Sequence, residues 1–184
     1  MQQSFRFTAL VLAVLFLVAQ PGSYAWSAVQ IESRYAAAVK DLTELENDKS
    51  RSARRDSWEA LAARFGALRT EAGASMDGAR AMFMEARVYG ALALRSGSRA
   101  DFTRAERAYG RTAEEYASTP LAPEALRRRA TILNTHLGDK AGALKVLDLL
   151  QTKYPDHDRR EAVAARKSPS SAKECLEKSR ARAR

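Results

Sequence analysis

The sequence predicts an all-α fold made of tandem antiparallel helical hairpins. One apolar pattern occurs twice, 38 residues apart, and each copy is followed by a proline stop, at Pro120 or Pro155. Within each copy the residues are spaced i, i+4, i+7, i+11, which places them on one stripe of a helix. No stretch alternates with period two for long enough to make a sheet. The two copies are Ala105, Tyr109, Thr112, Tyr116 and Ala143, Leu147, Leu150, Tyr154.

Six helices are expected, of which the first three lie before residue 96. The first is expected over residues 27–47 and ends at a polar break over 47–50. The second is expected over 52–72, and Gly73 with Ser75 as an N-cap separates it from the third, over 77–95. The residues expected inward are Tyr35, Ala38, Val39, Leu42 and Leu45, then Trp58, Leu61, Phe65 and Leu68, then Ala79, Met82, Phe83, Ala86, Tyr89 and Gly90.

The last three helices are bounded by turn and capping residues. Asp101 is a candidate cap for the fourth helix, which carries the first apolar stripe. Pro120 and Pro123 bracket the start of the fifth, as proline favours a first helical turn. The fifth helix ends at Gly138, and Asp139 caps the sixth, which ends before Pro155. Because the connections are short, neighbouring helices are expected to pack antiparallel. Tyr109 and Leu147, at the centres of the two stripes, are expected to be largely buried.

Residues 1–25 predict a secretory signal peptide. Arg6 supplies the positive charge, residues 7–19 are apolar apart from Thr8, and Pro21 then breaks the helix. The apolar stretch has 13 residues, whereas a spanning helix needs roughly 20. Cleavage is expected after Ala25, which predicts a periplasmic protein. The alternative is an uncleaved leader that anchors the chain, which would be its only contact with a membrane.

A helical domain is expected over residues 26–166, followed by a disordered basic tail over 167–184. A short capping helix is expected over 161–166. Residues 159–184 hold nine basic and three acidic residues, and such runs are typically solvated. Cys175, the single cysteine, lies in this tail, so no internal disulfide is expected and the thiol is interpreted as incidental.

The formal net charge of the chain is +9. In an exported protein this charge has little nucleic acid to meet, so no nucleic-acid partner is expected. Anionic cell-wall polymers, lipid headgroups and acidic proteins are the counter-charges that the predicted compartment offers.

Residues 102–161 resemble the tetratricopeptide repeat. That family places a small residue, a large one four later, a third three beyond, and a proline five after, on and behind its second helix. Ala143, Leu147, Leu150 and Pro155 match this spacing at all four positions. The preceding unit matches less closely, because the turn before Ala105 is longer and Pro120 is displaced, and the earliest unit, with Trp58, Leu61 and Phe65, matches weakly. The resemblance implies a solenoid of about three helical hairpins that binds other proteins.

A longer run is similar to the repeat region ahead of the catalytic domain in some bacterial N-acetylmuramoyl-L-alanine amidases. This resemblance implies a role in cell-envelope or cell-wall maintenance. The amidases bind zinc through His and Glu in a separate downstream domain, which does not follow here. The run comprises Trp58, Phe65, Ala79, Phe83, Tyr89, Asp101, Ala105, Tyr116, Pro120, Leu121, Ala122, Ala125 and Leu126.

The residues predict neither an enzyme nor a metal or cofactor site. Zinc hydrolysis needs about three converging ligands, and His136 and His157 are the chain's two histidines. His136 is expected to cap a helix or face solvent. Glu114 and Glu115 are consecutive on a helix, hence about 100° apart, which makes them a poor acid–base pair.

A partner-binding groove is expected where the first helix of each hairpin faces the concave side. With Met82 and Leu126 as packing anchors, the residues expected to face it are Arg80, Arg87, Arg127, Thr131 and Asn134. Arginine, threonine and asparagine suit carboxylates and peptide backbone. The sequence therefore favours a non-catalytic module that binds an envelope protein or peptide. The alternative is a cationic protein that binds anionic wall polymer or membrane through its tail.

Overall fold

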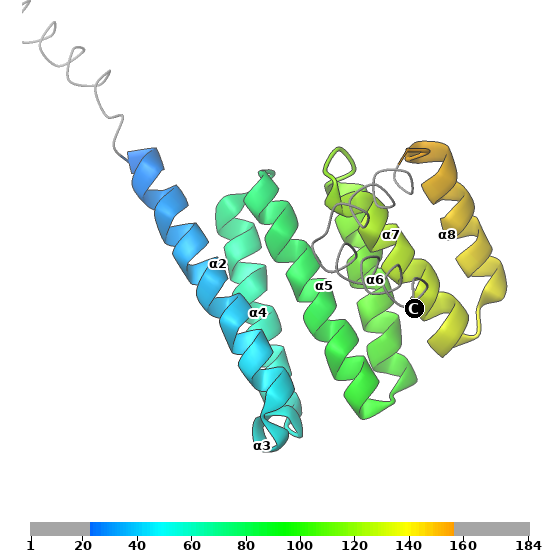
Figure 1. The fold of residues 1–184 in the computed structure, drawn as a ribbon, viewed down its shortest axis with the longest axis horizontal. Coiled ribbons are helices and arrows are strands. Elements are labelled where there is room, and N and C mark those ends of the chain that lie inside the picture. Colours follow the sequence, from blue (N-terminus) through cyan, green and yellow to red (C-terminus); the bar gives the residue numbers. More distant parts are fainter. Residues whose placement is uncertain (1–22, 157–184) are drawn as a thin grey trace, which may run out of the picture. The chain divides into compact units, whose positions relative to one another are not determined.

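The computed structural model describes residues 23–156, in which all regular structure is helical (Figure 1). The predicted all-α class is therefore confirmed for this part of the chain. The tail over 167–184, the expected capping helix over 161–166, His157, Cys175 and nearly all of the predicted leader lie outside the described residues. The elements are α2 (Ser23–Asn47), α3 (Lys49–Ser52), α4 (Arg55–Ala72), α5 (Met76–Ser96), α6 (Arg99–Glu115), α7 (Leu121–Ile132), a π-helical turn η1 (Leu133–Leu137) and α8 (Lys140–Lys153).

The chain divides into two compact units, with the division after Met82 inside α5. In the first unit, α2 packs on α4, and the residues predicted for the α4 face are all buried. Trp58 anchors this core: it is 1% exposed, and its Nε1 donates a hydrogen bond to the Ser52 carbonyl at 3.0 Å. The phenyl ring of Phe65 is also fully buried and meets the ring of Tyr35 edge-on at 6.0 Å.

Most of the predicted helix boundaries are confirmed. Gly73 and Gly138 adopt positive φ angles of 60° and 70°, which glycine tolerates because it has no Cβ. Ser75 Oγ accepts a hydrogen bond from the Gly78 amide at 3.2 Å, and Asp139 accepts one from the Gly142 amide at 2.8 Å. These side chains satisfy amides that the first helical turn leaves without partners.

Two boundaries differ from the prediction. The expected polar break holds the one-turn helix α3, because the Asp48 side chain accepts hydrogen bonds from the Ser50 and Arg51 amides. Asp101 is not the N-cap of α6, which begins at Arg99; the Asp101 carboxylate instead accepts a hydrogen bond from Ser96 Oγ at 2.6 Å.

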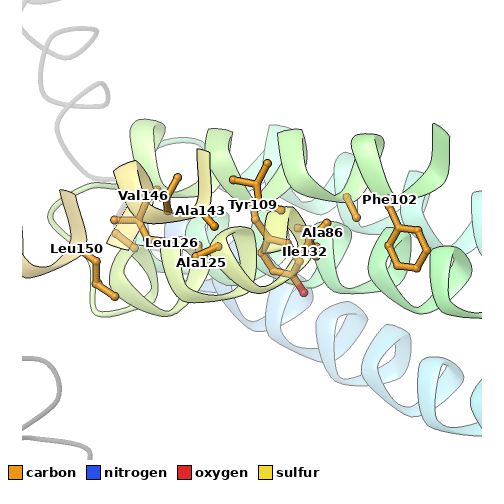
Figure 2. Packing of buried hydrophobic residues seen from close by; sticks show 14 of the residues in the cluster. Ala86, Phe102, Tyr109, Ala125, Leu126, Ile132, Ala143, Val146 and Leu150 are labelled. Carbon is orange, nitrogen blue, oxygen red and sulfur yellow. The ribbon is translucent and has the colours of Figure 1, made fainter. Parts of the chain in front are cut away.

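The core of the second unit lies among α5, α6, α7 and α8, where α6 packs on α7 and α7 packs on α8. Figure 2 shows labelled side chains from these four helices gathered between them. The first predicted stripe is confirmed, since all four of its residues are buried. Its small members, Ala105 and Thr112, are both fully buried, which lets the neighbouring helices approach closely.

The prediction that Leu147 is largely buried is wrong. Ala143 and Leu150 of the same stripe are 4% and 6% exposed, whereas Leu147 is 39% exposed and Leu144 is 67% exposed. The reason is that α8 is the last helix among the described residues and packs on α7 with one side only. The spacing therefore predicted correctly that Ala143 and Leu150 are buried, and it wrongly included Leu147 in the buried face.

Candidate binding surface on the second unit

The five predicted groove residues do not form one set. Arg80 belongs to the first unit, and Arg87, Arg127, Thr131 and Asn134 belong to the second. Arg80 donates hydrogen bonds to Glu32 at 2.9 Å and Asp77 at 3.3 Å, and its guanidinium lies 4.4 Å from the centre of the Tyr35 ring. The hydrogen bond to Glu32 is the main cause that raises the pKa of Arg80 above its ordinary value. Arg80 therefore joins α5 to α2.

The other four predicted residues lie on α5, α7 and the π turn. Arg87 is exposed on α5, and Thr131 and Asn134 are exposed on α7 and in the π turn. Arg127 is half-buried, and its Nη1 lies 3.7 Å from Glu124 Oε2. Thr131 Oγ1 donates a hydrogen bond to the Arg127 carbonyl at 3.1 Å, one helical turn earlier. The side chains of Arg127 and Thr131 therefore share one side of α7.

Tyr109 of α6 is a deeply buried tyrosine whose ring and hydroxyl lie beside α5. The residue is 4% exposed, and its ring meets Phe83 of α5 edge-on at 5.7 Å. A Cβ atom added to Gly90 would lie 3.8 Å from the hydroxyl oxygen, which places that oxygen beside α5. The hydroxyl has no hydrogen-bond partner among the residues that the structure describes.

Three charged side chains act on this hydroxyl. Burial raises the pKa of Tyr109 to about 12, the positive charges of Arg128 and Arg87 oppose that rise, and the negative charge of Glu124 adds to it. Tyr109 is therefore a neutral hydrogen-bond donor at physiological pH. Arg128 Nε lies 2.7 Å from Glu124 Oε1, so this arginine and glutamate are paired along α7. We name Tyr109, Arg87, Glu124 and Arg128 the Tyr109 cluster.

Of the four members of the cluster, only Arg87 is among the five predicted groove residues. Tyr109 was predicted as a core residue only, and Arg128 was not selected at all. A signal for Arg128 was present, because Glu124 and Arg128 are spaced i, i+4, the spacing of helical ion pairs. No comparable signal shows that the Tyr109 hydroxyl points toward α5 and α7, because that depends on how three helices pack.

The remaining polar clusters hold the helices together. Asp41 of α2 accepts hydrogen bonds from Arg51 of α3 at 2.7 Å and from Arg64 of α4 at 2.6 Å. His136 is exposed, as predicted, and its ring stacks on Phe102 at 4.0 Å. The described residues contain no group of three His, Cys, Asp or Glu side chains arranged to hold a metal ion.

No protein-family model, curated protein or solved structure matches this chain. Between residues 23 and 156, no helix combines the length and the apolar character needed to cross a bilayer.

Proposed function

We propose that this chain is a non-catalytic interaction module of the cell envelope, with helices arranged as tetratricopeptide-like antiparallel hairpins. It would be exported through its leader and would bind an envelope protein or peptide in the periplasm. It would serve cell-wall maintenance as a relative of the repeat region of N-acetylmuramoyl-L-alanine amidases. The observation that supports the proposal is the Tyr109 cluster, in which the positive charges of Arg87 and Arg128 act on a buried tyrosine hydroxyl of the packed helices.

The distribution of charged side chains over residues 29–156 supports a binding role for the second unit. Residues 29–82 carry nine basic and nine acidic side chains, and residues 83–156 carry twelve basic and nine acidic. The excess positive charge of the described chain therefore lies in the second unit, which also holds the cluster. Such an excess favours acidic partners and speeds their association.

Partner capture by the purified chain tests this function. The double variant Arg87→Ala, Arg127→Ala should fold normally by circular dichroism and lose saturable capture from a periplasmic extract. The matched control is Arg107→Ala, Arg111→Ala, which removes the same charge from exposed positions on α6 and should leave capture unchanged. Equal capture by both folded variants would refute binding through α5 and α7.

The basic tail supports a second candidate function. Residues 159–184 hold nine basic and three acidic residues, which suits an anionic wall polymer or membrane surface. Under this alternative, deletion of residues 167–184 abolishes retention on wall or membrane fractions, whereas the interaction module predicts little loss.

The enzymatic alternative predicts that the purified chain releases muropeptides from cell wall and that a zinc chelator blocks this release. The proposed interaction module releases none.

A further inference from the structure

One side of α8 carries apolar residues that the packing of the second unit leaves uncovered. The helix packs on α7 and on the π turn, and it is the last described helix of the unit (Figure 1). Leu144 is 67% exposed, Leu147 is 39% exposed, and Ala141 is exposed as well. Single exposed leucines are ordinary on a protein surface, but these three residues are spaced three apart and share one helix side.

Two opposite charges lie on either side of Leu144. Lys140 is four positions before it and Asp148 four positions after it, and both are exposed. Steps of four residues turn the helix by only about 40°, so the three side chains form one stripe. Along the helix axis the two charges are about 12 Å apart, which is too far for an ion pair within α8. Neither side chain has an ion-pair or hydrogen-bond partner among residues 23–156.

We propose that this side of α8 binds the same side of α8 in a second copy of the chain, with the two helices antiparallel. A two-fold axis beside Leu144 places that residue next to the partner's Leu144. It also brings each residue before position 144 level with the partner residue equally far after it. Lys140 therefore lies next to the partner's Asp148, and Leu147 lies next to the partner's Ala141. By symmetry each of these two contacts forms twice.

Charge complementarity favours a second copy over other occupants. In the antiparallel pair, two lysines meet two aspartates, so all four charges find a partner of opposite sign, which is the self-complementarity that a two-fold interface needs. An acidic partner would be attracted to Lys140 and repelled by Asp148. The basic segment 159–184 of the same chain, with nine basic and three acidic residues, would be attracted to Asp148 and repelled by Lys140.

A second stripe of α8 has the same spacing and lacks this complementarity. Leu149 is 44% exposed, and the exposed Lys145 and Lys153 lie four positions before and after it. Leu149 is five positions from Leu144, hence about 140° around the helix. A two-fold pairing centred on Leu149 would place lysine against lysine twice, and like charges in contact oppose association. This stripe is therefore the matched control.

Sedimentation equilibrium of the purified full chain tests the proposal. Over about 1 μM to 1 mM, the range of moderate to weak affinities, the wild type should show a reversible monomer–dimer equilibrium. Leu144→Glu places two carboxylates at the centre of the interface and should remove the dimer from this range. Leu149→Glu makes the same change on the control stripe and should leave the dimer unchanged. Circular dichroism would show that both variants, which alter exposed positions, remain folded.

Charge exchange identifies the partner and the register. Lys140→Glu brings two carboxylates together twice and Asp148→Lys brings two ammonium groups together twice, so each should weaken the dimer about tenfold or more. Both substitutions in one chain should restore the wild-type affinity. An equal mixture of the two single variants should also dimerise, because every contact then joins opposite charges. Lys145→Glu is the control for charge alone and should have little effect.

Four results would overturn the proposal. They are a wild type that stays monomeric throughout, equal losses for Leu144→Glu and Leu149→Glu, equal losses for Lys140→Glu and Lys145→Glu, and a double charge exchange that fails to recover the dimer. A monomeric wild type would mean that another protein, or residues 157–184 of the same chain, covers this side of α8. The proposed partner-binding function is separate, because its residues Arg87 and Arg127 lie on other helices, and partner capture should survive in Leu144→Glu.

Discussion

Replacing Arg129 with methionine should destabilise the protein by about 2–3 kcal/mol. The Arg129 side chain is 28% exposed and its partner Glu106 is 11% exposed, with 2.6 Å between Nε and Oε1. Removing one partner of a buried ion pair leaves an uncompensated charge, which typically costs about 3–5 kcal/mol. Because the Arg129 side chain retains some contact with water, the expected cost of about 2–3 kcal/mol lies at or just below the lower limit of this range.

The distance between the charges does not decide this magnitude. Arg111 and Glu115 are 2.9 Å apart, yet their side chains are 53% and 42% exposed. An exposed i, i+4 pair contributes about 0.3–0.5 kcal/mol. Arg111→Met is therefore the matched control, with a helical arginine and a similar contact distance, and its expected cost is several times smaller.

Urea unfolding at neutral pH, followed by circular dichroism, measures both variants. If the slope of the unfolding free energy against urea concentration is the same in the wild type and both variants, the variants expose the same surface on unfolding. The double variant Glu106→Leu, Arg129→Met should recover most of the loss, since replacing both partners with apolar groups removes the unpaired charge. A cost below about 1 kcal/mol for Arg129→Met alone would refute the burial of Glu106 between α6 and α7.

Two further predictions follow from burial. Leu150 is 6% exposed and Leu147 is 39% exposed. In the same urea titration, Leu150→Ala should therefore lower the unfolding free energy by about 2–5 kcal/mol and Leu147→Ala by less than about 1.5 kcal/mol. Equal losses for the two variants would contradict the packing of α8. The pKa of Tyr109 rises from 10.0 to about 12 in the folded state, so its contribution to stability is fully present below pH 10 and is lost as the pH rises to 12. The difference in unfolding free energy between wild type and Tyr109→Phe should therefore shift by about 2 kcal/mol over this interval, and parallel pH profiles would contradict it.

The helices could be predicted from the sequence because their signals are local. Glycine at positive φ, a capping Asp139 and apolar residues at helical spacing all act within a few positions of one another. The short helix α3 was missed because Asp48 was counted as part of a polar break, although its side chain caps the next turn. The burial of Leu147 was overestimated because spacing defines a helix face and does not define how much of it another helix covers.

The candidate binding surface could be predicted only in part because it depends on contacts between residues that are distant in the sequence. Arg87, Arg127, Thr131 and Asn134 belong to the second unit, and Arg80 does not. Arg80 is engaged by Glu32, which lies 48 positions earlier in the chain, and no local pattern reports such a contact. The Tyr109 hydroxyl was missed for the same reason, since its neighbours come from α5 and α7.

Site-specific photocrosslinking tests the central claim, that the side of α7 next to the Tyr109 cluster binds an envelope partner. A photoreactive phenylalanine analogue would replace Thr131, which is exposed on α7, or Arg107, which is exposed on α6. Arg107 lies two residues from Tyr109, on nearly the opposite side of the helix. Irradiation of the intact envelope should give a crosslinked protein at position 131 and none at 107. The same product at both positions, or at 107 alone, would contradict the account.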